Sequence, residues 1–90
     1  MKQIWKYIFV GYPGYRETTF DMPKDAKVFT VQAQGNDLCL WALVDPAAIK
    51  VGRKFVVFGT GWDIDFVTFA LNYVGTAQVD GLVWHVFEEI

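Results

Sequence analysis

The chain has 90 residues, of which 53% are hydrophobic and 18% aromatic, and its formal net charge is −2. A chain of this length holds one hydrophobic core, so we expect a single β-rich domain over residues 1–90. The slight negative charge argues against a binder of long nucleic acid, which ordinarily carries a basic face. One cysteine, Cys39, excludes an intrachain disulfide and a cysteine-cluster metal site.

The first residues alternate between polar and apolar types, which differs from the continuous apolar segment of a signal peptide. No apolar run approaches the roughly 18 residues that a membrane-spanning segment needs. From these two observations we expect a soluble, cytoplasmic protein with no membrane association.

A period of two in polar and apolar residues, typical of β-strands, runs through most of the chain. In the first such segment, KQIWKYIF, Trp5, Tyr7 and Phe9 fall on one side of the expected strand. The turn residues GYPG follow, and the polar segment YRETTFD predicts a strand at a sheet edge. The segment MPKDAK, with its proline and aspartate, predicts the next turn.

The middle of the chain predicts a hairpin and the central strand of the fold. In KVFTVQAQ the alternation places Phe29, Val31 and Ala33 on the buried side, and the following Gly-Asn suits a tight hairpin turn. The segment LCLWALV is apolar on both sides, which indicates a strand covered on both faces with Trp41 in the core. Pro46 then takes the chain out of the sheet, and RKFVVFG forms the next strand.

The last third of the chain contains one ambiguous segment and one strong hairpin. In DIDFVTFAL the spacing of Ile64, Val67 and Leu71 favours one or two turns of helix, whereas the β-branched and aromatic content favours strand or irregular loop. NYVGTAQV and LVWHVFE flank Asp80-Gly81, a strong hairpin signal. The seven strands together predict an all-β antiparallel meander that forms a sandwich or partly open barrel, with at most one short helix.

Groups for catalysis are scarce in this sequence. The chain has no serine, which excludes a Ser/His/Asp triad, and its single histidine, His85, excludes a multi-histidine metal site. Cys39 and His85 both lie in apolar strands, where packed side chains are the ordinary outcome. We predict a non-enzymatic protein without catalytic residues, metal or cofactor. Capping of a helix start or solvation of a loop explains the acidic pair Asp63 and Asp65, and we expect Glu88 and Glu89 at the end of the last strand to face water.

The segment FVVFGTGWDID raises the question of a binding loop. Successive N–H groups of Gly-Thr-Gly can hold an anion, although a plain strand-ending turn is the simpler interpretation. Trp62 is the tryptophan that we expect to be exposed, either to stack on a planar ligand or to bury against another chain. Arg53 and Lys54 lie about six residues away along the same strand, so within one protomer they are distant from the Gly-Thr-Gly loop. Assembly of two chains can bring the cations of one chain to the loop of the other.

At KQIWKY, LCLWALVDP, FGTG, YVGTAQ and WHVF the chain resembles a family of small, uncharacterised tailed-phage and prophage proteins, over essentially its full length. The MP-x-x-A-K turn agrees with that family, whereas Trp62 stands where its members usually have a histidine. The resemblance implies a phage accessory protein in the host bacterial cytoplasm that acts by binding, and it carries no catalytic assignment.

Two functional hypotheses follow. In the first, a homo-oligomer sequesters a small anionic, nucleotide-like ligand, such as a host immune signal, for counter-defence. In the second, the chain is a protein-interaction or virion-associated module that binds a host protein or a structural protein. The candidate ligand-binding residues of the first hypothesis are Trp62, Thr60, Gly61, Arg53 and Lys54, with Trp5, Lys6 and His85 as further members.

Overall fold

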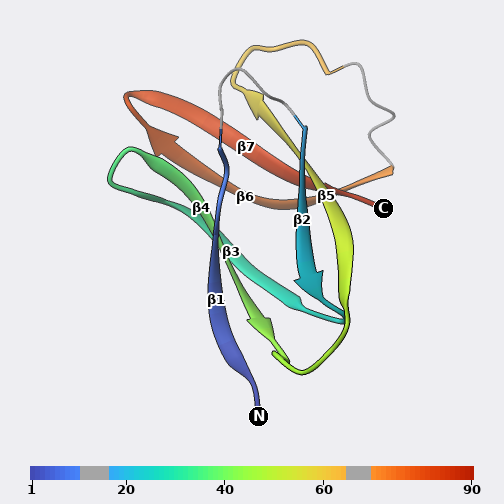
Figure 1. Ribbon diagram of the computed structural model, residues 1–90. Coiled ribbons are helices and arrows are strands. Elements are labelled where there is room, and N and C mark those ends of the chain that lie inside the picture. The colour runs from blue at the N-terminus through green and yellow to red at the C-terminus, as the bar shows by residue number, and fades with distance from the viewer. Residues whose placement is uncertain (11–16, 65–69) are drawn as a thin grey trace.

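The computed structural model describes residues 1–10, 17–64 and 70–90, which form two antiparallel β-sheets stacked as a sandwich (Figure 1). The three-stranded sheet has the order β1-β4-β3, and the four-stranded sheet has the order β2-β5-β7-β6. The sheets do not close into a barrel, so the all-β prediction is confirmed in its sandwich form. The strands are β1 (Gln3–Ile8), β2 (Glu17–Pro23), β3 (Lys27–Gln34), β4 (Asp37–Val44), β5 (Lys50–Gly59), β6 (Leu71–Val79) and β7 (Leu82–Glu89).

Among the strands of the described residues, two pairings join neighbours in sequence, the hairpins β3–β4 and β6–β7. The other pairs, β1–β4, β2–β5 and β5–β7, join strands that are distant in the chain, so the strand order is more complex than a simple meander. β2 lies at an edge of its sheet, as its polar sequence predicts, and this position tolerates Pro23, which has no N–H to donate.

Two of the predicted turns, the β6–β7 hairpin turn and the turn between β2 and β3, are present at their expected positions. Asp80 and Gly81 have φ angles of 55° and 75° between β6 and β7, as a primed two-residue turn requires. Asp25, between β2 and β3, has a φ of 64°, a conformation that aspartate tolerates better than most residues. These local signals therefore fix where the chain reverses.

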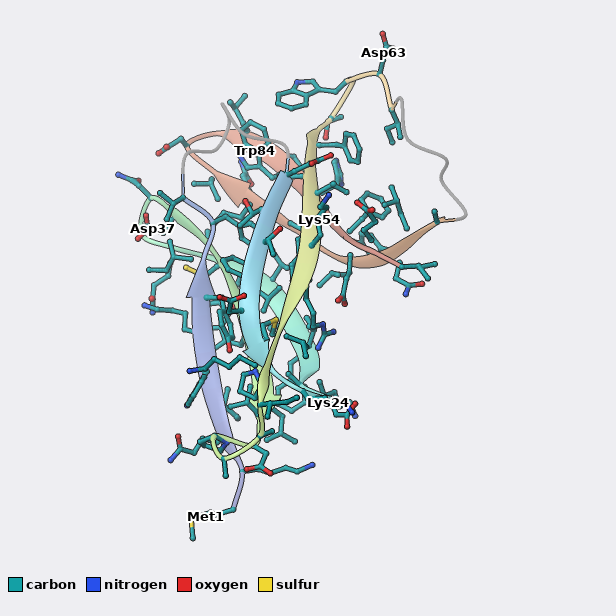
Figure 2. The ribbon with its side chains drawn as sticks, turned by 45° about the vertical axis from the view of Figure 1, so that its right-hand side comes forward. Met1, Lys24, Asp37, Lys54, Asp63 and Trp84 are labelled. Carbon is teal, nitrogen blue, oxygen red and sulfur yellow. The ribbon has the colours of Figure 1, made fainter. Side chains whose placement is uncertain are left out.

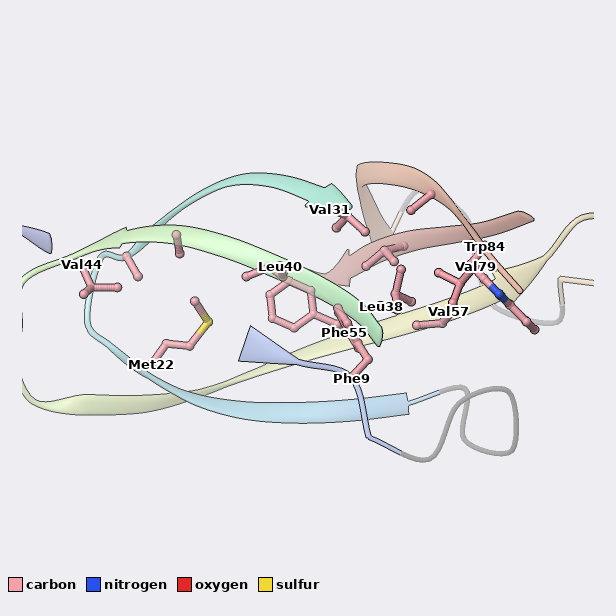
Figure 3. Packing of buried hydrophobic residues seen from close by; sticks show 14 residues of the cluster. Phe9, Met22, Val31, Leu38, Leu40, Val44, Phe55, Val57, Val79 and Trp84 are labelled. Carbon is pink, nitrogen blue, oxygen red and sulfur yellow. The ribbon is translucent and has the colours of Figure 1, made fainter. Parts of the chain in front are cut away.

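The core fills the space between the two sheets along their whole length (Figure 3). Met22 and Val44 lie toward one end of this core, and Val79 and Trp84 lie toward the other. β4 contributes every second residue from Leu38 to Val44, and all of these are at most 1% exposed. The described residues include no buried charged side chain, so burial of apolar surface is the main stabilising term for this interior.

Two predictions about buried aromatic residues are wrong. Phe29 is 45% exposed because the pairing of β3 with β4 shifts between Val28 and Thr30, and this bulge moves Phe29 off the buried side. Trp41 is only partly buried and is outside the core cluster, because alternation along β4 turns it away from the four-stranded sheet. Ala33, near the end of β3, is exposed as well.

The prediction that Glu88 faces water is also wrong. Glu88 pairs with Phe55 across β5 and β7 and accepts hydrogen bonds from Arg53 at 2.6 and 2.8 Å. The side chains of Arg53 and Glu88 are 22% and 18% exposed. Glu89, its neighbour, lies 3.9 Å from Lys54 on the other side of the sheet.

Cys39 is fully buried, so the reactivity of its thiol reports whether β4 remains packed in the sheet. Burial raises the pKa of this thiol because it disfavours the charged thiolate. We expect a thiol-specific reagent to react about a thousandfold or more slowly with the folded protein than with the denatured chain. Because the folded pKa is raised, this group stabilises the fold fully below its unfolded pKa and loses that contribution as the pH rises through the folded value.

The measurement is the rate of Cys39 labelling in buffer and in denaturant, repeated from neutral to alkaline pH. Labelling of the folded protein at the denatured rate would contradict the buried position of Cys39.

The segment 65–69, which includes most of the ambiguous helix prediction, lies outside the described residues. Within the described residues, no helix is long and apolar enough to cross a membrane.

Candidate functional site

The Gly-Thr-Gly segment forms a tight turn that ends β5. The N–H of Trp62 donates to the carbonyl of Gly59 at 3.1 Å, which closes a four-residue β-turn. Gly61 occupies the third position with a φ of 87°, where a residue with a side chain would be strained. The turn is also tied to the hairpin between β6 and β7, because the N–H of Thr60 donates to the carbonyl of Val83 at 3.2 Å.

Trp62 folds back over Gly59 and packs against Trp84. A Cβ atom at Gly59 would lie 2.8 Å from Cε2 and Nε1 of Trp62, so the missing side chain makes room for the indole. The Trp62 and Trp84 rings meet edge to face, with their centroids 5.5 Å apart and their planes at 83°. Trp84 is 2% exposed and Trp62 is 39% exposed, so Trp62 covers the end of the core while keeping part of its ring open.

A pocket of about 310 Å³ opens beside Trp62. The end of β5 supplies one wall and the β6–β7 hairpin the other, where Leu82 and Val83 are 56% and 37% exposed. Thr60 contributes the one hydroxyl group among the described lining residues, and none of those residues is a lysine or an arginine. The lining residues are Gly59, Thr60, Trp62, Gly81, Leu82, Val83 and Trp84.

Thr60 also belongs to a row of polar side chains that crosses the four-stranded sheet. Its hydroxyl lies 2.7 Å from Nε2 of His85, and Nδ1 of His85 lies 3.0 Å from the hydroxyl of Thr76. The Thr76 hydroxyl lies 2.7 Å from that of Tyr73. Hydroxyl groups both donate and accept, so either neutral form of the His85 ring fits this row. In the part of the chain that the structure describes, these bonds link the ring to threonines, whereas a hydrolytic triad orients its histidine with a carboxylate.

The predicted cations are not at this pocket. Arg53 lies between the sheets, bound to Glu88 and to the carbonyl of Ala26. Lys54 lies on the outer side of β5, 3.8 Å from Glu17 and 3.9 Å from Glu89. Figure 2 shows Lys54 well along the strand from the end that carries Asp63. The structure thus agrees with the expected separation of Arg53 and Lys54 from the Gly-Thr-Gly loop within one protomer.

The remaining predicted residues lie on the three-stranded sheet. Trp5 packs partly against the core, donates from Nε1 to Gln3 at 2.9 Å, and has the ammonium of Lys50 6.0 Å from its ring centroid. Lys6 lies on the opposite side of β1 and donates to Gln34 at 2.6 Å. The structure therefore brings together Trp62, Thr60 and Gly61, with His85 beyond Thr60, and places the other four candidates elsewhere.

Sequence analysis did not include Trp84, Leu82 and Val83 in the site. The hairpin that carries them is evident from Asp80-Gly81, but its position beside Trp62 depends on the pairing of β5 with β7, which joins Gly59 to Trp84. No local pattern marks such a pairing between strands that are distant in sequence.

Two further observations concern metal binding and a second hollow in the described structure. Within residues 1–10, 17–64 and 70–90, no three His, Cys, Asp or Glu side chains gather to hold a metal ion. A second hollow, of about 250 Å³, lies where β4 ends, and Lys2 and Lys24 line it together with Asp25 and Asp45. The lysines of this hollow are offset by carboxylates, so its charge favours neither sign.

Comparison with known proteins identifies the family but no activity. A family model described as "Domain of unknown function (DUF7352)" matches residues 1–90, so the chain belongs to this family. No curated protein and no solved structure matches the chain.

Proposed function

We propose that this member of a family of unknown function is a non-enzymatic binding protein that holds the planar ring of a small ligand in the pocket beside Trp62. The observation that carries the proposal is the position of the Trp62 indole, fixed against Trp84 over Gly59 and still 39% exposed. An aromatic ring that is rigid on one side and open on the other is a ready stacking surface.

The size and chemistry of the pocket support a ligand with one ring system. A volume of about 310 Å³ is at the lower end of the range for small-molecule sites. Leu82 and Val83 supply apolar walls beside the Trp62 ring. Base stacking on an aromatic side chain contributes about 1–3 kcal/mol. A nucleobase fits these requirements.

Charge favours recognition through the base over recognition through a phosphate. The described lining residues carry no cation, and the turns that build the pocket carry Asp63 and Asp80. We therefore expect phosphate groups of a nucleotide to point away from the pocket toward solvent. In the proposed biological setting, a phage accessory protein in the host cytoplasm, the ligand is a base-containing immune signal that the protein sequesters without converting it.

The proposal predicts that removing the Trp62 ring abolishes ligand binding. The experiment compares the Tm of the wild type, Trp62→Ala and Trp62→Phe with adenosine, AMP, ADP-ribose and cyclic dinucleotides. A ligand present at 100 times its Kd stabilises the fold by about 2.7 kcal/mol, which is a shift of several degrees for a domain of this size. We expect this shift for the wild type, a smaller one for Trp62→Phe and none for Trp62→Ala.

Lys6→Ala is the matched control, because Lys6 lies on the other sheet and its replacement leaves the pocket intact. A comparison of adenosine with AMP tests the direction of the phosphate, since a base-led site binds the two with similar affinity. The absence of any shift across the whole panel, or an undiminished shift in Trp62→Ala, would refute the proposed pocket.

A protein-interaction or virion-associated module is the second candidate function. It is favoured by apolar side chains that the outer side of the three-stranded sheet leaves exposed, among them Ile4 at 60% and Ile8 at 37%. This function predicts indifference to every nucleotide of the panel. Recovery of the protein from purified virions distinguishes a structural role from capture of a host protein.

A further inference from the structure

β4 is apolar on both sides, but the sandwich fully covers only one of them. Leu38, Leu40 and the other inward residues pack against the four-stranded sheet. Trp41 and Leu43 point to the opposite side and remain partly exposed. A strand that is apolar on both sides is normally covered on both sides. The outer side is therefore only partly covered in the single chain as described, because Cys39 on that side is fully buried whereas Trp41 and Leu43 are not.

β1 extends this partly covered surface, whereas the β3 residues that pair with the outward residues of β4 are the polar Thr30, Gln32 and Gln34. Ile4 and Ile8 of β1 lie opposite Leu43 and Cys39, on the same side of the sheet. Phe29 at the bulge of β3 adjoins it, with the ammonium of Lys27 6.0 Å from its ring centroid. We call this surface the outer face, defined by Ile4, Lys6, Ile8, Lys27, Trp41 and Leu43.

The charges at the outer face are arranged to complement a second copy of the same face. Lys6 lies directly opposite Trp41 at the middle of the face, whereas Asp37 begins β4 on the same side. Asp45 directly follows the last residue of β4 and accepts a hydrogen bond from the N–H of Ala47 at 3.0 Å. Each end of β4 is about 13 Å from Trp41, at roughly 3.4 Å per residue. When two sheets pack with their strands crossing near 90°, β4 of one copy runs over the row that contains Lys6 of the other.

From this arrangement we infer that the outer face packs on the outer face of a second copy of this chain, with Trp41 near a two-fold axis. In the crossed packing, one acidic end of β4 lies within reach of the partner's Lys6, and the symmetry repeats this contact. In the single chain Lys6 reaches across β4 to Gln34 instead. The inference is independent of the proposed ligand pocket, which belongs to the other sheet.

The area of three short strands sets the expected strength. The face measures about 27 Å along β4 and about 15 Å across, which is roughly 400 Å² per copy and about 800 Å² for the pair, the size of a weak, transient interface. We therefore expect a weak dimer, with a Kd on the order of hundreds of micromolar. Sedimentation equilibrium from about 10 µM to 1 mM protein covers this range.

The test measures dimer formation by the wild type and by variants on the two sides of the molecule. Ile4→Lys and Trp41→Lys place an additional positive charge among the apolar side chains beside Lys6 and should weaken dimerisation at least tenfold. Ile4 is 60% exposed on an edge strand, so that variant keeps the fold even where Trp41→Lys does not. Tyr73→Lys is the control, because Tyr73 is 62% exposed on the four-stranded sheet. Circular dichroism verifies the fold of each variant.

A charge exchange identifies the pairing. Lys6→Asp alone should weaken the dimer, and mixing it with an Asp37→Lys or Asp45→Lys variant should restore association between the two different chains. A wild type that remains monomeric at 1 mM, or a dimer that Tyr73→Lys disrupts and Ile4→Lys does not, overturns the inference. Trp62→Ala should leave the dimer unchanged, which separates this result from the outcome for the ligand pocket.

Discussion

A Phe55→Ala variant is expected to lose about 3–5 kcal/mol of unfolding free energy, because the change removes a fully buried ring and leaves a cavity. Phe55 is 0% exposed and stands at the centre of the core, with its ring centroid 5.7 Å from that of Phe20 and 6.1 Å from that of Phe9. Phe20 and Phe55 belong to β2 and β5, and Phe9 directly follows β1, so the loss affects both sheets. A domain of this length is stable by about 5–13 kcal/mol in total, and the variant should therefore be close to unfolding.

Urea denaturation of the two proteins, followed by tryptophan fluorescence, measures this loss. Val10→Ala, at a position that is 75% exposed, is the control and should change the unfolding free energy by no more than about 0.5 kcal/mol. A loss below about 1 kcal/mol in Phe55→Ala would mean that the three rings do not pack as described.

The second large effect is expected at the ion pair of Arg53 and Glu88. Arg53 donates from Nε and Nη2 to the two carboxylate oxygens of Glu88 and from Nη1 to the carbonyl of Ala26. The hydrogen bonds to Glu88 are the main cause of the raised pKa of Arg53. Removing Arg53 leaves a partly buried carboxylate and a carbonyl without their donor. We expect Arg53→Ala to cost about 2–4 kcal/mol.

A double-mutant cycle separates the pair from the packing of its side chains. Arg53→Ala, Glu88→Ala and the double variant are unfolded in urea at low and high salt. We expect the double variant to lose less than the sum of the two single changes, because neither charge is then left without its partner. Since both groups are mostly buried, added salt should weaken the coupling only slightly. Additive losses would show that the two charges do not depend on each other.

The parts of the fold that follow from local sequence were predictable. The hairpins β3–β4 and β6–β7 form where Gly-Asn and Asp-Gly interrupt the alternation, because these residues favour the turns that antiparallel strands need. The β2 strand lies at a sheet edge, where its polar and charged side chains protect the unpaired backbone groups from pairing with another chain. Such signals act over a few residues and do not depend on the rest of the chain.

The errors come from pairings between distant strands. Phe29 fits the alternation of β3, but the bulge that exposes it exists only in the pairing with β4. Glu88 reads as the solvated end of the last strand, and its partner Arg53 is 35 residues away in the sequence. The pattern of each strand alone contains no information on either contact.

The candidate site shows the same division. The turn at Gly61 and the partial exposure of Trp62 follow from local composition, because a tryptophan between glycine and aspartate has little apolar sequence around it. The pocket beside Trp62 could not be predicted from local sequence, because it depends on the pairing of β5 with β7. This pairing places Leu82 and Val83 beside the turn. Trp41 was predicted to lie in the core because its strand is apolar on both sides. A single sandwich places only one of these sides in its core, and Trp41 lies on the other.

An interior made of hydrocarbon side chains, as described for residues of both sheets, affects how this protein can diverge. Volume and shape constrain such positions more than chemical identity does, so valine, leucine, isoleucine and phenylalanine can replace one another there when their total size is kept. The left-handed backbone at Asp25 and Asp80 allows far fewer alternatives. Homologues should therefore retain the residues at their turns longer than the residues of their core. A search for distant homologues should give most weight to the turn positions.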